Sequence, residues 1–416
     1  MPEVRIALVG IGGYGEFYLQ QIDSVEKSTE YKLTAAAEYN TDVREKISLK
    51  YGFAERGVRL FEDYESMLAE GQNLFDIVIL SVGTGLHEAY SAMAMKRGIP
   101  VLCEKPPAAV IQEVDSMTKC SDETGVLCNI GFQSQFQPFV KNLQRLLCEG
   151  EIGRVTDISF MGVWTRYRSY YTRNAWAGKI RAGSKWVLDG PIANPMAHQL
   201  MNSLYYASLD AGKTAVPVSV EAEMYHGHDI EGEDTSCLRV ITENDVRINF
   251  FTTLCGERNN EQHIEITGED GSVTLSSGLT NAEIYKKGKL SKLIEGAQMD
   301  QTLKITNTAR AFLGKEKPDC PVSITRNFVL ALNGAYESSG RVLNIPETEI
   351  EKTEFLHEDR YGDTIKDERT AVKGIEKIMS ECFRRRVMFS EYGVPWAKAS
   401  RKFNLNGYDF FNPDIN

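Results

Sequence analysis

The sequence has no apolar run long enough to span a bilayer, and its first apolar segment begins at Val4 without a basic-then-apolar leader before it. We therefore expect no membrane segment, no secretory signal and a cytoplasmic location. The composition of the 416 residues, 42% hydrophobic and 25% charged, is typical of folded globular proteins. The chain is too long for one compact core, which predicts more than one domain.

Basic stripes and paired cysteines are also missing. The formal net charge is -11, and no cationic stripe occurs apart from Arg384–Arg386, so we expect no nucleic-acid partner. The eight cysteines include no CxxC pair, which favours reduced thiols. His226 and His228 offer two possible ligands without a closing set nearby, which favours a turn or an exposed edge over a metal site.

The strongest functional signal lies in the first forty residues. The apolar run 4–9 leads into Gly10–Gly15, which reads GIGGYG, and then into a segment of helical pattern. The first glycine of such a turn permits the tight bend, the second lets the backbone approach a pyrophosphate, and the last lets the helix pack on the strand. Glu38 follows at the offset usual for a carboxylate that binds a ribose diol. The pattern predicts dinucleotide contacts from Gly10, Gly12, Gly13, Tyr14, Gly15 and Glu38.

Glu38 also bears on the choice of dinucleotide. Its carboxylate would repel a 2′-phosphate, and residues 39–42 bring no arginine to receive one, although Arg44 is close enough in sequence to swing in. The sequence therefore predicts NAD as the cofactor and makes NADP less favoured.

Apolar periodicity divides the chain into three parts. In residues 1–133, strand-like and helix-like segments alternate, which predicts an α/β Rossmann domain. In residues 134–345, short strand-like runs joined by polar turns predict an α+β domain with a large, mainly antiparallel sheet. Residues 346–416 are expected to add a long helix, from Thr364 to Met388, and a tail that pack on the first two parts. In the first domain we expect strands at 4–9, 33–37, 77–82, 101–103 and 127–131.

A lysine stands at the end of one expected strand. Residues 101–103 are followed by Glu104, Lys105 and Pro106, and the carboxyl ends of parallel strands line the crevice where such sheets bind ligands. The proline would hold Lys105 in an extended or cis geometry. A lysine before a proline is more often a surface feature, but this position in a Rossmann domain favours a place in the site.

With the turn Gly10–Gly15, the Glu104–Pro106 motif and the two-domain plan, nearly all of the chain resembles the Gfo/Idh/MocA family, that of glucose-fructose oxidoreductase and inositol dehydrogenase. The resemblance implies an open-faced sheet in the second domain, through which copies pair into a homodimer or homotetramer. It implies that Lys105 contacts both nicotinamide and substrate. It also implies cofactor contacts from Ser81, Gly83, His87 and Glu104.

Two segments depart from the family pattern. Residues 131–138, which resemble the domain-crossing segment and include the candidate substrate contact Gln133, carry Gln135 where the family usually has arginine. The family motif Asp-x-x-x-His has its best match at Asn194 and His198, with asparagine in place of aspartate. Residues four apart share a helix face, so both could address one substrate. We interpret His198 as catalytic, and Asn194 as an orienting group that carries no charge.

Other substrate candidates lie close to this motif. Asp189 is the nearest spare carboxylate and could be either a site residue or a helix cap. The stretch 164–176 is rich in aromatic and guanidinium groups, which suits recognition of a polyol, although packing of a sheet edge explains it equally well. Its candidates are Tyr171, Arg173 and Trp176.

Together these features predict an NAD-dependent oxidoreductase that acts on a secondary alcohol of a sugar, sugar derivative or cyclitol. His198 would take the hydroxyl proton while hydride leaves the same carbon for nicotinamide, and Lys105 would stabilise the oxygen. A redox-neutral enzyme that modifies sugars by transient oxidation, with Tyr171 or Asp189 as an extra acid or base, stays open. A non-catalytic sensor of NAD or sugar stays open as well.

Overall fold

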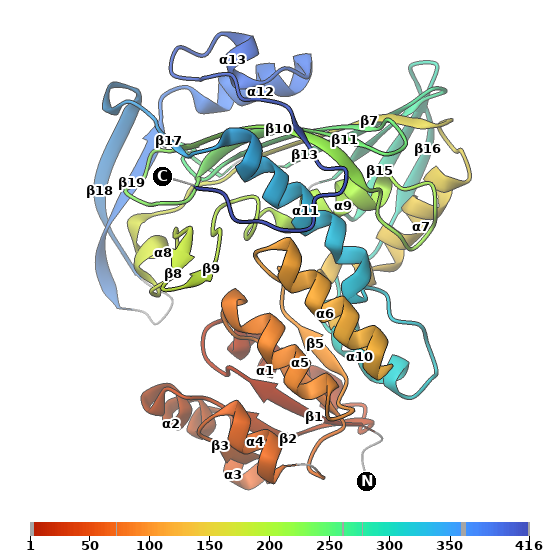
Figure 1. Cartoon of the computed structure of the whole chain (residues 1–416), viewed down its shortest axis with the longest axis vertical. Helices are drawn as coiled ribbons and strands as arrows, with labels where there is room; N and C mark the ends of the chain where they lie inside the picture. Colours follow the sequence, from red (N-terminus) through yellow and green to blue (C-terminus); the bar gives the residue numbers. More distant parts are fainter. Residues whose placement is uncertain (1–3, 72, 260–261, 277, 359–362, 415–416) are drawn as a thin grey trace. The chain divides into compact units, whose positions relative to one another are not determined.

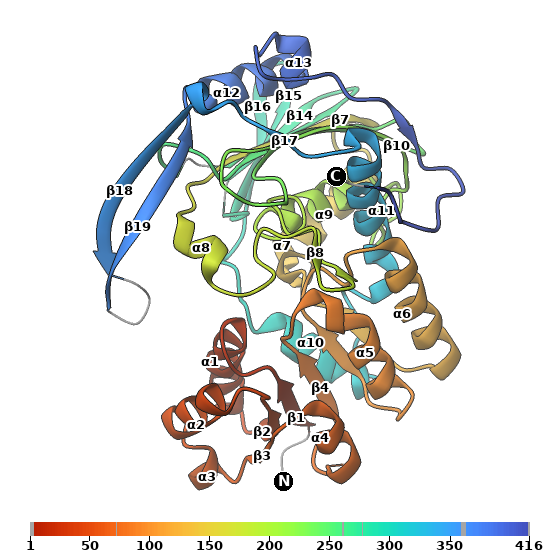
Figure 2. The same cartoon turned by 60° about the vertical axis from the view of Figure 1, so that its left-hand side comes forward.

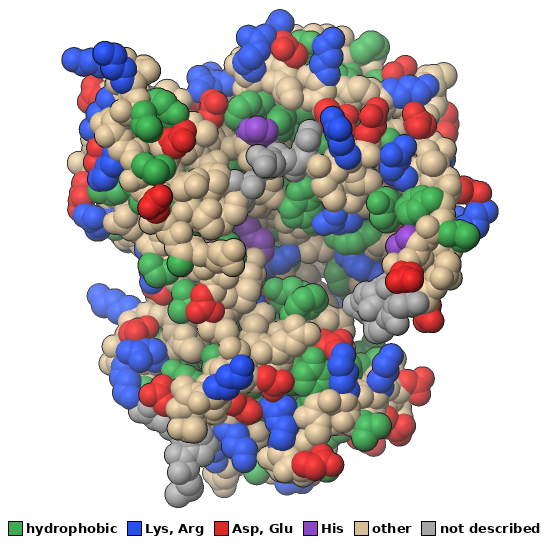
Figure 3. All heavy atoms as spheres, turned by 180° about the vertical axis from the view of Figure 1, so that it is seen from behind, with side chains coloured by type: hydrophobic (Ala, Val, Ile, Leu, Met, Phe, Trp, Pro, Cys, Tyr) green, Lys and Arg blue, Asp and Glu red, His purple; other side chains and the backbone are tan. Residues whose placement is uncertain are grey.

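A computed structural model describes residues 4–71, 73–259, 262–276, 278–358 and 363–414. The chain forms two compact units, the first made of 1–108, 112–137 and 300–326, the second of 109–111, 138–299 and 327–416. This division differs from the predicted boundaries at 133 and 345, because a late segment returns to the first unit. Among the described residues, no helix is long and apolar enough to cross a membrane. On the face shown in Figure 3, cationic and anionic side chains are interspersed.

The first unit is built on a parallel sheet, which confirms the predicted Rossmann class (Figure 1). Within the described residues the sheet has six strands in the order β3-β2-β1-β4-β5-β6. The residues of β4 are all fully buried, as expected for a central strand covered on both faces. The strands are β1 (Val4–Val9), β2 (Tyr31–Ala37), β3 (Arg59–Phe61), β4 (Ile77–Leu80), β5 (Val101–Cys103) and β6 (Cys128–Ile130).

Helices cover this sheet, and one of them comes from much later in the chain. Helix α10 (Leu303–Phe312) places Ile305 and Ala309 in the same apolar core as β1 and β5. Sequence periodicity gave no indication of this return. The other helices are α1 (Tyr14–Glu26), α2 (Thr41–Lys50), α3 (Phe53–Arg56), α4 (Tyr64–Glu70), α5 (His87–Met95) and α6 (Ile111–Thr124), with short 3₁₀ turns η1 (Thr84–Leu86) and η2 (Gln133–Phe136).

The second unit contains a larger, mainly antiparallel sheet, as predicted. Its described strands run in the order β16-β15-β14-β13-β7-β12-β11-β10-β17, and β20 also pairs with β10. The pairs β7–β12 and β10–β17 are parallel. These strands are β7 (Val155–Val163), β10 (Pro217–His226), β11 (Thr235–Thr242), β12 (Arg247–Thr253), β13 (His263–Gly268), β14 (Ser272–Leu275), β15 (Asn281–Lys286), β16 (Lys289–Glu295), β17 (Leu343–Asn344) and β20 (Phe403–Asn404).

Helices lie on both faces of the larger sheet. Figures 1 and 2 show α9 and α11 on one face and α12 and α13 on the other. A small hairpin and a short helix precede α9 in the chain. These elements are α7 (Pro138–Cys148), α8 (Arg168–Thr172), β8 (Arg181–Ala182), β9 (Lys185–Trp186), α9 (Ala197–Tyr206), α11 (Val322–Ser339), α12 (Ile375–Arg385) and α13 (Phe389–Tyr392).

The predicted long helix from Thr364 to Met388 is wrong in its first part. Strand β19 (Thr364–Val372) pairs along its whole length with β18 (Ile350–Glu358) as a two-stranded antiparallel ribbon. Helix α12 begins only after Gly374, which has a positive φ of 69°. The apolar stripe of α12 is real, because Ile375 and Met379 are fully buried against the sheet. The apolar spacing of α12 does not extend back over residues 364–372. These residues form a strand because β18 pairs with them.

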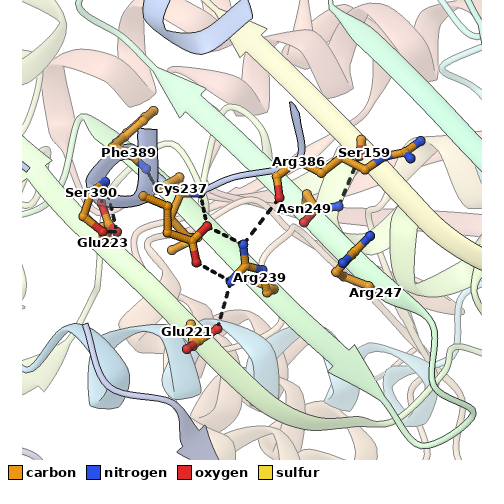
Figure 4. A network of polar contacts seen from close by, with 12 residues as sticks. Ser159, Glu221, Glu223, Cys237, Arg239, Arg247, Asn249, Arg386, Phe389 and Ser390 are labelled. Carbon is orange, nitrogen blue, oxygen red and sulfur yellow. Dashed lines mark hydrogen bonds and ion pairs between the residues drawn. The ribbon is translucent and has the colours of Figure 1, made fainter. Parts of the chain in front are cut away.

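Polar contacts hold the C-terminal helices on the sheet (Figure 4). Arg239 of β11 forms a two-bond ion pair with Glu391 of α13, at 2.9 and 2.7 Å, and also contacts Glu221 of β10 at 3.3 Å. Glu223 of β10 accepts hydrogen bonds from the backbone and hydroxyl of Ser390. The C-terminal segment therefore covers the part of the sheet face formed by these strands.

The glycine-rich turn shows why α1 can follow β1 so closely. A Cβ on Gly15 would lie 1.8 Å from the carbonyl oxygen of Gly10, and a Cβ on Gly10 would lie 2.3 Å from the carbonyl oxygen of Ser81. All of these obstructing atoms belong to the backbone, so no side chain can move aside. A Cβ on Gly13, in contrast, would meet nothing within 4 Å.

We expect Gly15→Ala to destabilise the protein by about 3 kcal/mol, because the new methyl group overlaps backbone atoms. Gly57→Ala serves as the matched control and should cost about 1 kcal/mol, because Gly57 has a left-handed conformation and a Cβ there would meet nothing within 4 Å. Urea unfolding followed by circular dichroism measures both losses. Equal losses would show that the contact with Gly10 does not limit the turn.

Candidate functional site

The carboxyl ends of β1 and β2 meet at the glycine-rich turn. Glu38, at the end of β2, is 7% exposed and accepts hydrogen bonds from the backbone N–H of Ile11, at 3.2 Å, and of Asn40, at 3.1 Å. Helix α1 begins at Tyr14 and has no side-chain cap, so its N-terminus can receive an anion. The open space at Gly13 and this uncapped helix end fit a dinucleotide pyrophosphate.

Arg44 lies beside Glu38 but is already engaged. Its guanidinium donates to the carbonyl oxygen of Glu38 at 2.9 Å and lies 3.5 Å from the carboxylate of Glu62. An arginine held in this way is not available to a 2′-phosphate unless these contacts break. The local geometry therefore agrees with the preference for NAD over NADP.

The loop after β4 joins the same edge of the sheet. The N–H of Ser81 donates to Val9 at 2.9 Å, and Gly83 immediately precedes η1. His87 is 1% exposed, and its ring nitrogens lie 2.8 Å from the carbonyl oxygen of Pro106 and 3.0 Å from that of Val82. Burial lowers the pKa of His87. His87 therefore links the loop after β4 to the loop after β5.

The Lys105 loop follows β5, and its Lys105–Pro106 peptide bond is cis. The side chain of Glu104 turns inward, where it is 6% exposed and accepts the hydroxyl of Tyr18 at 2.6 Å. Its second oxygen accepts the backbone N–H of Lys105 at 3.0 Å. A Cβ on Gly131 would lie 2.6 Å from this carboxylate, so the glycine makes room for it.

Sequence reasoning missed Lys304 of α10, which lies behind this loop. Its ammonium is 3.2 Å from the carboxylate of Glu104, and its side chain has no solvent exposure. It also lies over the rings of Tyr18 and Tyr14, 4.1 and 5.2 Å from their centroids. Burial lowers the pKa of Lys304, and the neighbouring Glu104 opposes this effect. One lysine within a helical segment gives no signal from which this role could be predicted.

In the second unit, the expectation that Asn194 and His198 share a helix face needs correction. Helix α9 begins at Ala197, and Asn194 lies in the hydrogen-bonded turns before it. Pro195 has no backbone N–H to donate to the carbonyl oxygen of Pro191, as the interior of a regular helix through this segment would require. His198 is half-buried in the first turn of α9. The amide of Asn194 donates to Asp189 at 2.9 Å.

Asp189 joins the segments around it and does not cap α9, whose N-cap is Met196. It is 5% exposed and also accepts the backbone N–H of Gly178 at 2.7 Å. The guanidinium of Arg173 lies 3.7 Å from its carboxylate and 5.1 Å from the ring centroid of Trp176. The structure therefore brings together four predicted residues, Arg173, Trp176, Asp189 and Asn194.

Tyr171 does not belong to this group. Its ring packs on His228, 4.7 Å between ring centroids, and its hydroxyl is buried. Burial raises the pKa of Tyr171 well above its ordinary value. In the first unit, Gln133 is half-buried at the start of η2, and Gln135 is fully buried.

His228 is buried, not at an exposed edge, and it lies beside Asp234 and Cys255. Ligand atoms of these three residues lie within 4.8 Å of one another. His228 Nδ1 contacts Asp234 at 2.8 Å and Cys255 at 3.3 Å, while Nε2 contacts the carbonyl oxygen of Arg166 at 3.1 Å. Hydrogen bonds within the chain thus satisfy both ring nitrogens without a metal.

Sequence analysis also did not single out Glu233. This residue is fully buried beneath the segment that leads to Asn194. It accepts the hydroxyl of Tyr336 at 2.5 Å and the backbone N–H of Ile192 at 3.3 Å. A Cβ on Gly190 would lie 2.1 Å from its carboxyl carbon, so only glycine fits there. Burial raises the pKa of Glu233 to about 8.

This pKa predicts a specific pH dependence of stability. Between 4.5, the ordinary value, and about 8, the folded protein keeps a proton that the unfolded chain releases, so the contribution of Glu233 to stability falls as the pH rises. From pH 5 to pH 8, Glu233→Gln should therefore gain about 3 kcal/mol relative to wild type. Urea unfolding at each pH measures the difference. The exposed control Glu295→Gln should show no such trend, and parallel curves for Glu233→Gln would contradict the assignment.

Comparison with known proteins extends these observations. Residues 4–132 match the GFO_IDH_MocA model, an oxidoreductase family with an NAD-binding Rossmann fold. The uncharacterized oxidoreductase YfiI of Bacillus subtilis is 24% identical over 213 residues, 49% of this chain and 52% of that protein. The scyllo-inositol 2-dehydrogenase (NADP(+)) IolU of the same species is 26% identical over 184 residues, 44% of this chain and 53% of that protein. These matches span about half the length of each relative.

A solved structure shows the same fold over more of the chain. The WlbA dehydrogenase from Bordetella pertussis, in complex with NADH and UDP-GlcNAcA, matches with a TM-score of 0.69 at 22% identity, over 81% of this chain and 96% of that one. The family match includes the glycine-rich turn, the Lys105 loop and all the described strands of the Rossmann sheet. Over residues 4–132 the chain is therefore similar to the Gfo/Idh/MocA family of oxidoreductases, and the solved structure extends the likeness in fold to most of the chain.

Proposed function

We propose that this protein is an NAD-dependent oxidoreductase that oxidises or reduces a secondary hydroxyl of a sugar, sugar derivative or cyclitol. The observation that carries the proposal is the convergence of four loops at one edge of the Rossmann sheet. Because all the described strands of that sheet are parallel, the turn after β1, Glu38 after β2, Ser81 after β4 and Lys105 after β5 share this edge.

The strand order adds a reason for binding at this place. From β1 the chain proceeds outward through β2 and β3, whereas β4, β5 and β6 lie on the opposite side of β1. The loops after β1 and β4 therefore diverge at a topological switch point, where open parallel sheets bind their ligands. The cofactor contacts proposed here are the turn Gly10–Gly15, Glu38, Ser81, Gly83 and the Glu104–Lys105 pair.

A polyol substrate suits the second unit. Arg173 provides a guanidinium, Trp176 an aromatic face, and Asn194 an amide held by Asp189. Such groups bind hydroxyls and pack on sugar rings. IolU is named a scyllo-inositol dehydrogenase, and the WlbA structure holds a nucleotide sugar, so both names support a sugar or cyclitol.

In the proposed reaction, His198 takes the proton of the substrate hydroxyl, since an imidazole titrates close to neutral pH. Lys105 donates a hydrogen bond to the same oxygen and stabilises its developing negative charge. Bound NAD supplies the hydride acceptor. Asn194 orients the substrate without contributing charge.

The contacts of Tyr171 and Asp189 favour net oxidation or reduction over the redox-neutral alternative. That alternative needs a further acid or base, but the Tyr171 hydroxyl is buried and its pKa is raised. Both oxygens of Asp189 accept hydrogen bonds from Gly178 and Asn194. These contacts are typical of structural groups. The presence of both Lys105 and His198 favours an enzyme over a sensor.

The test is absorbance at 340 nm with NAD and a panel of sugars, cyclitols and glycosides, with product analysis in parallel. Accumulation of NADH with one substrate supports the proposal. Product without net NADH supports the redox-neutral alternative. A signal in neither channel, while calorimetry still detects binding of NAD, supports the sensor.

Substitutions test the two assigned roles. His198→Asn should lower kcat about 10²- to 10⁴-fold, the usual contribution of a general base. Lys105→Met should lower kcat about 10²- to 10³-fold through loss of oxyanion stabilisation. His263→Asn and Lys96→Met, both exposed in the structure, are the matched controls and should keep wild-type rates. Wild-type kcat in His198→Asn would exclude the proposed acid–base role.

A further inference from the structure

Lys304 is an unusual lysine because its side chain is wholly buried in the first unit. Lysine is rarely buried unless a partner compensates the loss of hydration. The partner here is the carboxylate of Glu104, 3.2 Å away, and the rings of Tyr18 and Tyr14 lie close to the ammonium. Such rings stabilise a cation electrostatically.

The Glu104 carboxylate connects Lys304 to the Lys105 loop. One oxygen receives the ammonium of Lys304 and the hydroxyl of Tyr18. The other receives the backbone N–H of Lys105, at 3.0 Å. The same carboxylate therefore pins the backbone from which the side chain of Lys105 extends. If the ammonium were absent, a buried carboxylate would lose its cationic partner.

The chain brings Lys304 to this place from a long way along the sequence. Residues 138–299 belong to the second unit, and the chain then returns to the first unit with 300–326. On α10, Lys304 is adjacent to Ile305, which is fully buried in the core of the Rossmann sheet. The position of the ammonium is thus set by the packing of a whole helix, not by a mobile loop.

We propose that Lys304 is a positioning residue: through Glu104, its ammonium holds the Lys105 backbone in the conformation needed for the reaction. Only the expected effect of Lys304 on the reaction rate rests on the proposed function. The structural part of the proposal, control of the Lys105 amide by Lys304, can be measured without substrate or cofactor.

The experiment compares Lys304→Met, which removes the charge, with Lys304→Arg, which keeps it, and with Lys315→Met as control. Lys315 is exposed shortly after α10. Hydrogen exchange of the Lys105 amide is followed by mass spectrometry with residue-level fragmentation. We expect this amide to exchange about tenfold faster in Lys304→Met than in wild type, because its acceptor is no longer held. The control should match wild type.

A double variant separates charge from packing. In Lys304→Met combined with Glu104→Gln, no buried carboxylate is left without a cation, and the glutamine oxygen can still accept the Lys105 N–H. We expect this variant to recover slow exchange and much of the thermal stability. Faster exchange in both the single and double variants would mean that the methylene chain of Lys304 matters and its charge does not, which overturns the proposal.

Activity then gives an independent readout. Lys304→Met should lower kcat about 10²-fold, as expected when a reacting group is misplaced by a small distance. The Kd for NAD, measured by calorimetry, should change less than about threefold, and Lys304→Arg should recover part of kcat. If wild type turns over no substrate, the proposed function fails, and the exchange data still decide the role of Lys304.

Should Lys304→Met fail to fold, Lys304→Gln takes its place. It removes the charge that faces Glu104 and keeps a polar side chain in the buried site. Exchange of the Lys105 amide faster than wild type in Lys304→Gln supports the proposal. Unchanged exchange in whichever of these two variants folds shows that the ammonium does not hold the loop, and overturns it.

Discussion

Parallel pairing of the Rossmann strands is the constraint on which the candidate cofactor site depends. In a parallel sheet every strand ends at the same edge, so residues separated by long stretches of sequence arrive together. Gly10, Glu38, Ser81 and Lys105 each directly follow or closely follow a strand of this sheet. Their proximity is a consequence of strand direction, and it requires no specific contact among the four residues.

Buried carboxylates then fix the loops that the sheet brings together. Glu104 holds the Lys105 backbone and is compensated by Lys304, whereas Glu233 supports the segment before α9 and is compensated by protonation. Asp234 accepts hydrogen bonds from the backbone N–H groups of Gly227 and His228 and lies 2.8 Å from His228 Nδ1. These are three solutions to one problem, because a buried charge needs either a partner, a proton or a dense set of hydrogen bonds. Burying each carboxylate lowers the stability of the fold. Each carboxylate also accepts hydrogen bonds from the backbone and so fixes the loop around it.

The C-terminal segment changes the surface of the second unit. Helices α12 and α13 pack on the sheet through an apolar cluster, and the Arg239–Glu391 ion pair adds a polar contact (Figure 4). The family resemblance implies pairing of copies through an open sheet face. Over β10 and β11 this face is occupied by the chain itself, so a homodimer or homotetramer remains a proposal that would have to use other strands, such as β13–β16.

The sequence by itself determined the first sheet apart from the short strand β3, the glycine-rich turn, the acid after β2 and the lysine after β5, because these depend on local periodicity and fixed spacing. It also predicted the mainly antiparallel second sheet. Tertiary structure decided the rest. Lys304 and Glu233 act through partners far away in sequence, and the strand nature of 364–372 depends on pairing with 350–358. A residue whose role comes from a distant neighbour leaves no local pattern, and only the folded chain brings the two together.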